Sequence, residues 1–214
     1  MTRPPIVVAL LVALAALGGC QAVSTPPPGP SAGSSSPIPS PPPTPSAVAF
    51  AGDPRTLLIP LPPGATAEPR RGSEDGRLTV VQAAALHNPQ MVSEVVDYLT
   101  GFDFVEGAYS SWHDPAGNVV VLQLLEFGTV DQGELWTTKE KGLFGLSNLA
   151  LRSDALATVP GGRWIELKVD NGYAFLTAVF GKGTIGAVLT VVSPGTANLD
   201  LLNQLAAAQY ANLP

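Results

Sequence analysis

The fold of this chain is decided by residues 104–127, whose sequence is FVEGAYSSWHDPAGNVVVLQLLEF. Two β-rich runs, Phe104 to His113 and Val119 to Phe127, flank a turn sequence that contains proline, glycine and asparagine. This pattern predicts an antiparallel hairpin. In the second run, apolar residues occupy both the even and the odd positions. We therefore expect its strand to lie in the centre of a sheet that is covered on both sides.

The residues before this hairpin predict a short strand and two helices. The run from Thr56 to Leu61 reads as a strand that its prolines confine to an edge. Residues 79–82 (TVVQ) have the spacing of a capping box, which predicts a helix over residues 83–86. Asn88-Pro89 is expected to begin a second helix, because asparagine is a good N-cap and proline suits the first helical position. Gly101 is expected to end that helix.

The residues after the hairpin predict another helix, more strands and a final helix. Residues 129–132 (TVDQ) repeat the capping-box spacing, and the helix that is expected to follow carries Leu135, Trp136, Leu143 and Phe144. The remaining expected elements are a strand near Leu156–Val159, antiparallel strands over 163–169, 173–180 and 184–192, a hairpin turn at Asn171-Gly172, and a helix over 197–211 with Leu199, Leu202, Leu205 and Ala206 inward.

These elements predict an α+β domain with a largely antiparallel sheet. When the two helices before the hairpin are counted as one interrupted helix, the first six elements follow the βαββαβ order of a ferredoxin-like unit, and a β-meander and a C-terminal helix follow them. The alternative is a Mog1/PsbP-like arrangement, in which a central antiparallel sheet lies between helices.

Charge divides the chain into an uncharged N-terminal part and a charged domain. The chain has 214 residues and a formal net charge of -6, yet no charged side chain occurs between Pro4 and Gly52. An acidic protein gains nothing from the charge of a polyphosphate, so nucleic acid is not an expected partner. We expect the globular domain to span residues 53–214.

The N-terminal residues predict export and a lipid anchor. A positive start is followed by an apolar run from Ile6 to Leu17, which is too short to span a bilayer and is typical of a signal peptide. Leu17-Gly18-Gly19-Cys20 then resembles the lipobox of bacterial lipoproteins, and Cys20 is the single cysteine of the chain. The resemblance implies removal of residues 1–19 by cleavage between Gly19 and Cys20, and diacylglycerol on the Cys20 thiol. The expected location is the extracytoplasmic face of the cell membrane.

Residues 20–52 are expected to form a disordered tether. Ten prolines lie between Gln21 and Ser46 among Ser, Thr, Gly and Ala, so no apolar surface is available to bury. In a polyproline II conformation this stretch reaches roughly 80 Å from the membrane at about 3.1 Å per residue. The chain is rich in Ala, Val, Gly, Leu and Pro and has four lysines, a composition that suggests a GC-rich genome. Together with this composition, the stretch looks like part of an actinobacterial lipoprotein.

No motif predicts a cofactor, a metal site or a catalytic site. Gly181 to Gly186 (GKGTIG) matches the dinucleotide pattern, but a β-rich run follows where a helix is required, so nucleotide binding is not expected. His87 and His113 are the two histidines, and neither lies in a zinc-ligand spacing. Gly145 to Asn148 lacks the final glycine of a nucleophile elbow.

Five aromatic residues are the candidate binding residues. They could line an apolar ligand pocket, although the same residue types commonly pack in cores. The set is Tyr109, Trp112, Trp136, Trp164 and Tyr173.

The sequence therefore predicts a lipid-anchored, non-enzymatic binding or interaction module of the cell envelope. Its partner is expected to be a protein, an envelope component or an apolar ligand. The alternatives are a carrier of a small apolar ligand or lipid, and an envelope enzyme without a recognisable motif.

Overall fold

The computed structural model describes residues 49–68, 75–146, 150–167 and 172–214, and of these the side chains of residues 143–146 are excluded. The predicted signal peptide, Gly19, Cys20 and most of the tether lie outside these ranges, as do Asn171 and the side chains of Leu143 and Phe144. In the described part, the two strands of the opening stretch have the predicted bounds: β3 is Phe104–His113 and β4 is Val119–Phe127. The turn between them is closed by Asp114, whose carboxylate accepts hydrogen bonds from the backbone and side-chain nitrogens of Asn118 at 2.8 and 2.6 Å.

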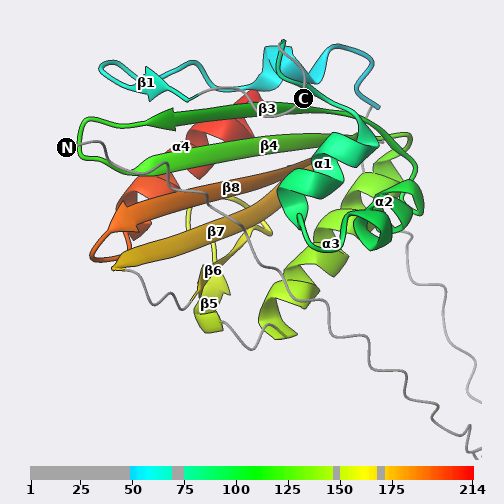
Figure 1. Ribbon diagram of the computed structural model, residues 1–214. Coiled ribbons are helices and arrows are strands. Elements are labelled where there is room, and N and C mark those ends of the chain that lie inside the picture. The colour runs from blue at the N-terminus through cyan, green and yellow to red at the C-terminus, as the bar shows by residue number, and fades with distance from the viewer. Residues whose placement is uncertain (1–48, 69–74, 147–149, 168–171) are drawn as a thin grey trace, which may run out of the picture.

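All the described strands belong to one antiparallel sheet (Figure 1), so the predicted fold class is confirmed. Its order is β1-β3-β4-β8-β7-β6-β5, and β2 pairs with β3 beside β1. Strand β4 is therefore internal, as its two apolar faces predict. The other strands are β1 (Thr66–Ala67), β2 (Arg77–Leu78), β5 (Ala150–Ala155), β6 (Arg163–Leu167), β7 (Tyr173–Lys182) and β8 (Ile185–Pro194).

From β2 to β5 the chain order follows the βαββαβ prediction, with β2 as its first strand and β5 as its last, when the two helices between β2 and β3 are counted as one. The meander β6-β7-β8 and a C-terminal helix then follow. Every strand pair in the described part of the chain is antiparallel, and β5 lies beside β6 at the opposite end of the sheet order from β2. The helices are η1 (Pro54–Leu57, a 3₁₀ helix), α1 (Val80–His87), α2 (Val92–Thr100), α3 (Val130–Leu146) and α4 (Leu199–Asn212).

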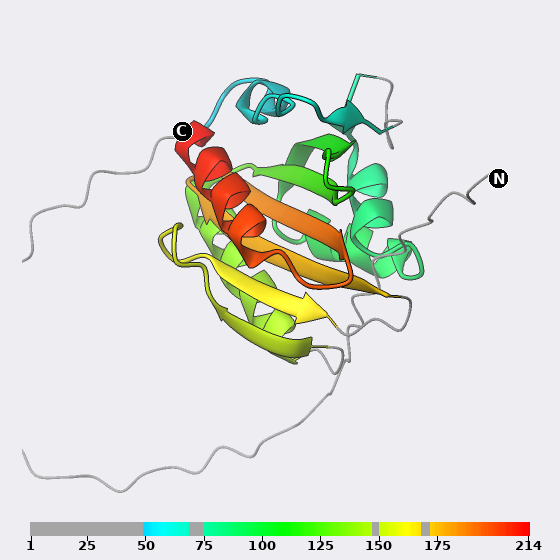
Figure 2. The same ribbon diagram turned by 90° about the vertical axis from the view of Figure 1, so that its left-hand side faces the viewer.

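Helices cover both faces of the sheet, as in the alternative arrangement with a sheet between helices. Figure 2 shows α4 on one face and α1 on the other. On the α4 face, Leu122 and Leu124 of β4 pack in a core that includes Leu202 and Ala206 of α4. The opposite face, which we call the α1–α3 face, holds a second core that contains residues from all three helices.

Two predicted strands are wrong. At residues 56–61 the backbone instead forms η1 and a loop, because Asp53 caps the 3₁₀ helix. The buried Gln209 side chain of α4 accepts a hydrogen bond from the Ile59 amide at 3.1 Å and donates one to the Leu57 carbonyl at 2.8 Å, which takes the place of a strand neighbour. Residues 156–159 lie in the loop between β5 and β6, where Leu156 and Val159 still pack into the core.

The residues at the N-terminal ends of the helices predicted where α1 and α3 begin, but not where α2 begins. Thr79 and Gln82 form the complete capping box at α1, and the Thr129 hydroxyl accepts a hydrogen bond from the Gln132 amide at the start of α3. Helix α2 begins at Val92 and not at Asn88-Pro89, because the Asn88 side chain accepts a bond from the Gln90 amide in a turn.

Residues 181–186 form the hairpin that joins β7 and β8, with Gly183 at a positive φ of 58°. The turn and the strand after it agree with the β-rich context that argued against a dinucleotide site. Gly186 also permits a close approach, because a Cβ atom there would lie 2.3 Å from a ring carbon of the fully buried Trp136.

We predict that Gly186→Ala lowers the free energy of unfolding by about 2 kcal/mol, because the new methyl group overpacks the core against Trp136. Gly142→Ala in α3 is the matched control. No heavy atom lies within 4 Å of its new Cβ atom, so higher helix propensity should raise stability by up to about 1 kcal/mol. Urea denaturation measures both, and equal effects of the two substitutions would contradict the packing argument.

Candidate functional site

The structure does not bring the five candidate aromatic residues together. Trp112 and Trp164 lie in the core on the α4 face, whereas Tyr109 and Trp136 lie in the core on the α1–α3 face. Tyr173 is half-buried at a third, smaller cluster. The reason is the two-residue period of a strand: Tyr109 and Trp112 are three residues apart on β3, so their side chains point to opposite faces. The three tryptophans are at most 7% exposed and pack as core residues.

His113 lies in a surface cluster with a carboxylate. Its Nε2 atom is 2.7 Å from Glu68 Oε1, and the Ser111 hydroxyl donates to Glu68 Oε2 at 2.8 Å. Ser111 and His113 point to the same side because they are two residues apart on β3. In a hydrolytic triad, however, the histidine lies between the nucleophile and the carboxylate, so that it removes the proton of the serine. Here the carboxylate lies in the middle, and Ser111 has no imidazole base.

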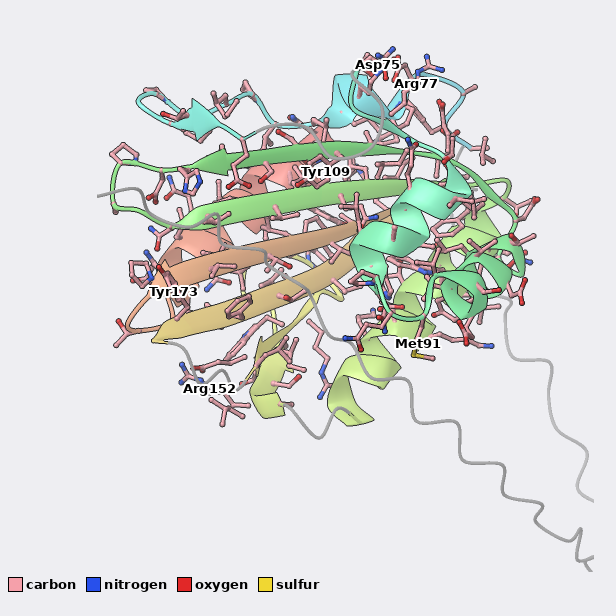
Figure 3. All side chains as sticks on the ribbon, in the orientation of Figure 1. Asp75, Arg77, Met91, Tyr109, Arg152 and Tyr173 are labelled. Carbon is pink, nitrogen blue, oxygen red and sulfur yellow. The ribbon has the colours of Figure 1, made fainter. Side chains whose placement is uncertain are left out.

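A network of charged residues holds residues 53–55 against the sheet edge. Arg55 pairs with Asp53 and, at 2.7 Å, with Asp75. Arg77 on β2 contacts Asp53 at 3.3 Å and Glu106 of β3 at 3.5 Å. Asp75 and Arg77 lie together at this edge of the sheet in Figure 3. The hydrogen bond from the Arg55 side chain holds the pKa of Asp53 well below its usual range.

Glu126 extends this network with a carboxyl group that is partly removed from water. It is paired with Glu106 across β3 and β4. Burial first, and then the negative charges of Glu106 and Asp53, raise the pKa of Glu126 to about 6. The ionised form of Glu126 is thus disfavoured in the folded state. In this cluster the two arginines are already paired with carboxylates, so the role of the cluster is to stabilise the fold.

A buried polar cluster links the three helices of the α1–α3 face. His87 at the end of α1 has its Nε2 atom 3.1 Å from Glu140 Oε1 of α3, and their side chains are 4% and 0% exposed. The Tyr98 hydroxyl of α2 donates to Glu140 Oε2 at 3.2 Å. A buried carboxylate needs such partners, because an unpaired charge in the core costs several kcal/mol.

Opposing effects act on the titration of this cluster. Burial favours neutral His87, but the negative charge of Glu140, 3.1 Å from its Nε2 atom, outweighs burial, so the pKa of His87 is raised. Burial and the Glu140 charge also raise the pKa of Tyr98. The cluster lies beneath the helices and not at an open surface, so its role is to hold the three helices together.

A groove runs along the exposed side of α3. It consists of two adjoining hollows of about 550 and 200 Å³, which share Thr138, Lys141 and Gly161. We call it the α3 groove. Its walls are α3, the β5–β6 loop and the β7–β8 turn.

Positive charge exceeds negative charge in the α3 groove. Lys141, Arg163 and Lys182 line it, together with the carboxylates of Glu134 and Asp154. The Lys141 ammonium donates to the Gly161 carbonyl across the groove at 2.7 Å, and Lys182 donates to the Leu213 carbonyl at 2.9 Å. The cations are therefore held in place. This balance differs from that of the whole chain, whose formal net charge is -6.

The described residues contain neither a cluster of metal-binding side chains nor a helix suited to span a membrane. Within the described ranges, no group of three or more His, Cys, Asp or Glu side chains is placed to hold a metal ion. In the same part of the chain, no helix is both long enough and apolar enough to cross a membrane.

The sequence contained signals for some of these contacts. Glu140 follows Trp136 by four residues, so it lies on the same inward side of α3, and this spacing alone indicates a buried carboxylate. The two-residue spacing of Ser111 and His113 likewise predicts a shared face. Nothing local indicates that Asp53 meets Arg77, or that Glu140 meets His87, because these residues come from separate elements.

The sequence matches no model of a known protein family and no curated protein. Among solved structures, the chain is similar to the extracellular domain of PknH from Mycobacterium tuberculosis. The sequences are 12% identical, the TM-score is 0.42, and the match covers 54% of this chain and 67% of that one.

We predict that the His87–Glu140 pair makes stability depend on pH above neutrality. Because the folded pKa of His87 is raised above 6.5, the pair stabilises the fold fully below that pH and loses this contribution as the pH rises through the folded pKa. Glu140→Gln should abolish this decline and lower the free energy of unfolding by about 3 kcal/mol at pH 6. Thermal unfolding between about pH 6 and 9 measures both effects.

His113→Asn is the control, because it removes the exposed histidine and should leave the decline unchanged. A Glu140→Gln variant that keeps the decline of the parent protein would show that another group causes it.

Proposed function

We propose that this chain is a lipid-anchored, extracytoplasmic, non-enzymatic binding module, and that it binds a negatively charged component of the cell wall in the α3 groove. The observation that carries the binding part is the α3 groove, with its excess of fixed cations in an acidic chain. The anchoring part rests on the sequence around Cys20.

The lipobox supports the anchor. The thiol of Cys20, the single cysteine, follows two glycines that leave the peptide bond accessible to a signal peptidase. A diacylglycerol on this thiol supplies two acyl chains, and two chains suffice for stable attachment at about 0.8 kcal/mol per buried methylene group. The negative charge of the domain would oppose binding to an anionic bilayer, so attachment through the lipid is the consistent mechanism.

The place where the chain enters the domain supports a role for the tether in presenting the groove. The Phe50 amide donates a hydrogen bond to the Thr184 hydroxyl at 3.1 Å. Thr184 follows Gly183, which lines the end of the α3 groove. The tether therefore ends close to one end of the groove, and its length allows the groove to reach roughly 80 Å from the membrane at about 3.1 Å per residue.

The charge of the groove supports an anionic ligand over an apolar one. An apolar ligand needs an enclosed apolar cavity, whereas the tryptophans are used in the core. Free carboxylates on a wall polymer match the lysines and the arginine of the groove. Because these cations are already held in place, little side-chain conformational freedom is lost when the ligand binds, and the contacts are stronger.

We expect Cys20→Ala to leave the protein unprocessed or to release it from the membrane fraction. Cell fractionation and incorporation of an alkyne-labelled fatty acid measure this outcome. Ser36→Ala in the tether is the control and should behave as the parent chain does. Equal lipid labelling of the Cys20→Ala variant would show that the anchor is elsewhere.

We expect Lys141→Glu to weaken binding of the anchored protein to purified, insoluble peptidoglycan by about tenfold, and added salt to weaken binding of the parent protein. Lys139→Glu is the matched control, because it makes the same charge change two residues away, where the ammonium lies over the Phe102 ring. Detergent-solubilised protein that cosediments with peptidoglycan measures binding. Equal binding by the parent and by Lys141→Glu would contradict the groove as the binding site.

A further inference from the structure

Strand β5 is an open edge of the sheet. It is the last strand in the sheet order, and in Figure 2 no described element lies on its outer side. The opposite edge differs, because β1 and β2 both pair with β3 there and the charged network around Arg77 lies beside them. An open edge offers unpaired backbone groups that can pair with another strand.

The hydrogen bonds next to β5 show which of its backbone groups point outward. The Leu156 amide donates to the Gly162 carbonyl at 2.9 Å, so residue 156 faces β6. Backbone groups alternate in direction along an antiparallel strand, so those of Asp154 and Arg152 also face β6. The backbone groups of Ser153 and Ala155 therefore face outward.

The side chains of β5 carry a self-complementary charge pattern. Arg152 and Asp154 are two residues apart, exposed, and on the same side of the strand. When two β5 strands pair antiparallel about Ser153, Arg152 of each copy lies opposite Asp154 of the other. In this register Ser153 is a hydrogen-bonded pair with itself. The Arg–Asp positions are then non-hydrogen-bonded pairs, in which facing side chains approach most closely.

The side chain of Arg152 is already held in one position within a single copy of the chain. Its guanidinium lies 5.5 Å from the centre of the Trp164 ring, and its Nε atom pairs with Glu166 of β6. Asp154 forms no ion pair within the described residues, where its carboxylate accepts a hydrogen bond from the Ala155 amide. Leu151, which is 59% exposed, lies opposite Ala155 of the other copy in the same register. One copy thus offers an ordered cation where the other offers an unpaired carboxylate.

Edge strands often carry charges that prevent pairing, and β5 also has an irregular register at Ala150 and Arg152. Charges of one sign repel a second copy, but the alternate signs at 152 and 154 attract it. A two-fold axis through Ser153 satisfies both ion pairs at once, as an isologous interface requires.

We propose that this chain forms a symmetric dimer through antiparallel pairing of β5 with β5 of a second copy, in register about Ser153, so that two sheets join into one. The dimer does not depend on the lipid or on a ligand in the α3 groove. Its failure and the failure of the proposed function are therefore distinguishable.

Ser153→Cys in the full-length protein, extracted in detergent, tests the register. Facing residues in this register have Cα atoms about 5.5 Å apart, within the range of a disulfide. We expect oxidation to give a covalent dimer. The parent protein is the control for Cys20, and Thr196→Cys, on the exposed loop before α4, is the control for random collision within a micelle. No covalent dimer from Ser153→Cys, or as much from Thr196→Cys, overturns the proposal.

Charge reversal tests the ion pairs and separates them from a folding defect. Arg152→Asp and Asp154→Arg alone each place like charges opposite one another at two symmetric positions, so each should weaken dimerisation by about tenfold. The double variant restores opposite charges and should recover dimerisation, which a folding defect would not do. Sedimentation velocity over a concentration series measures this. A parent protein that stays monomeric, or that pairs β5 with a peptide of another protein, overturns the second copy as the occupant.

Discussion

Strand β4 has apolar side chains on both faces, and each face must be removed from water. Its even-numbered leucines require a layer on one side, which α4 supplies, and its odd-numbered residues require a layer on the other, which α1, α2 and α3 supply. Each fully buried leucine contributes roughly 2 kcal/mol. The position of β4 between β3 and β8, the two cores and the three-layer arrangement all follow from this one requirement.

Burial of whole helices then forces polar groups to find partners inside the domain. Gln123 of β4 donates to the Ala83 carbonyl of α1 at 3.2 Å, and Gln209 of α4 bonds the backbone on either side of Leu58. Glu140 fills the same need on the α1–α3 face with His87 and Tyr98. These contacts tie each helical layer to its neighbours, so the domain holds its shape without a disulfide. The polar groups inside this domain therefore stabilise the fold.

The surface offers two distinct features, and they lie near each other. The α3 groove and the outer edge of β5 share Ser153, Asp154 and Ala155. A ligand in the groove and a second copy at the edge would therefore meet the same strand from two directions. Phe50, whose amide donates to the Thr184 hydroxyl, lies near the other end of the groove and away from β5.

The sequence by itself determined the elements whose causes are local. The hairpin of residues 104–127, the capping box at Thr79, the glycine turn at residues 181–183 and the inward face of α4 depend on neighbours a few positions away, and each was predicted. The resemblance of residues 17–20 to a lipobox is also local, but Cys20 lies outside the described residues and its lipidation stays a prediction. The sequence also predicted β3, β4, β6, β7 and β8, because the alternation of apolar residues is local, whereas the strands expected at residues 56–61 and near 156–159 did not form.

Only the tertiary structure decided which distant residues meet. Residues 56–61 were expected to be a strand, but the Gln209 amide from the far end of the chain replaced the strand neighbour. The five aromatic residues were expected to be able to share a pocket, but the sheet separates Trp112 from Tyr109 and Trp136. The partners of Glu140, the charge balance of the α3 groove and the open edge of β5 arise from packing between elements. Local residue patterns determine which face of an element a side chain lies on, but the element that packs against that face depends on the whole fold.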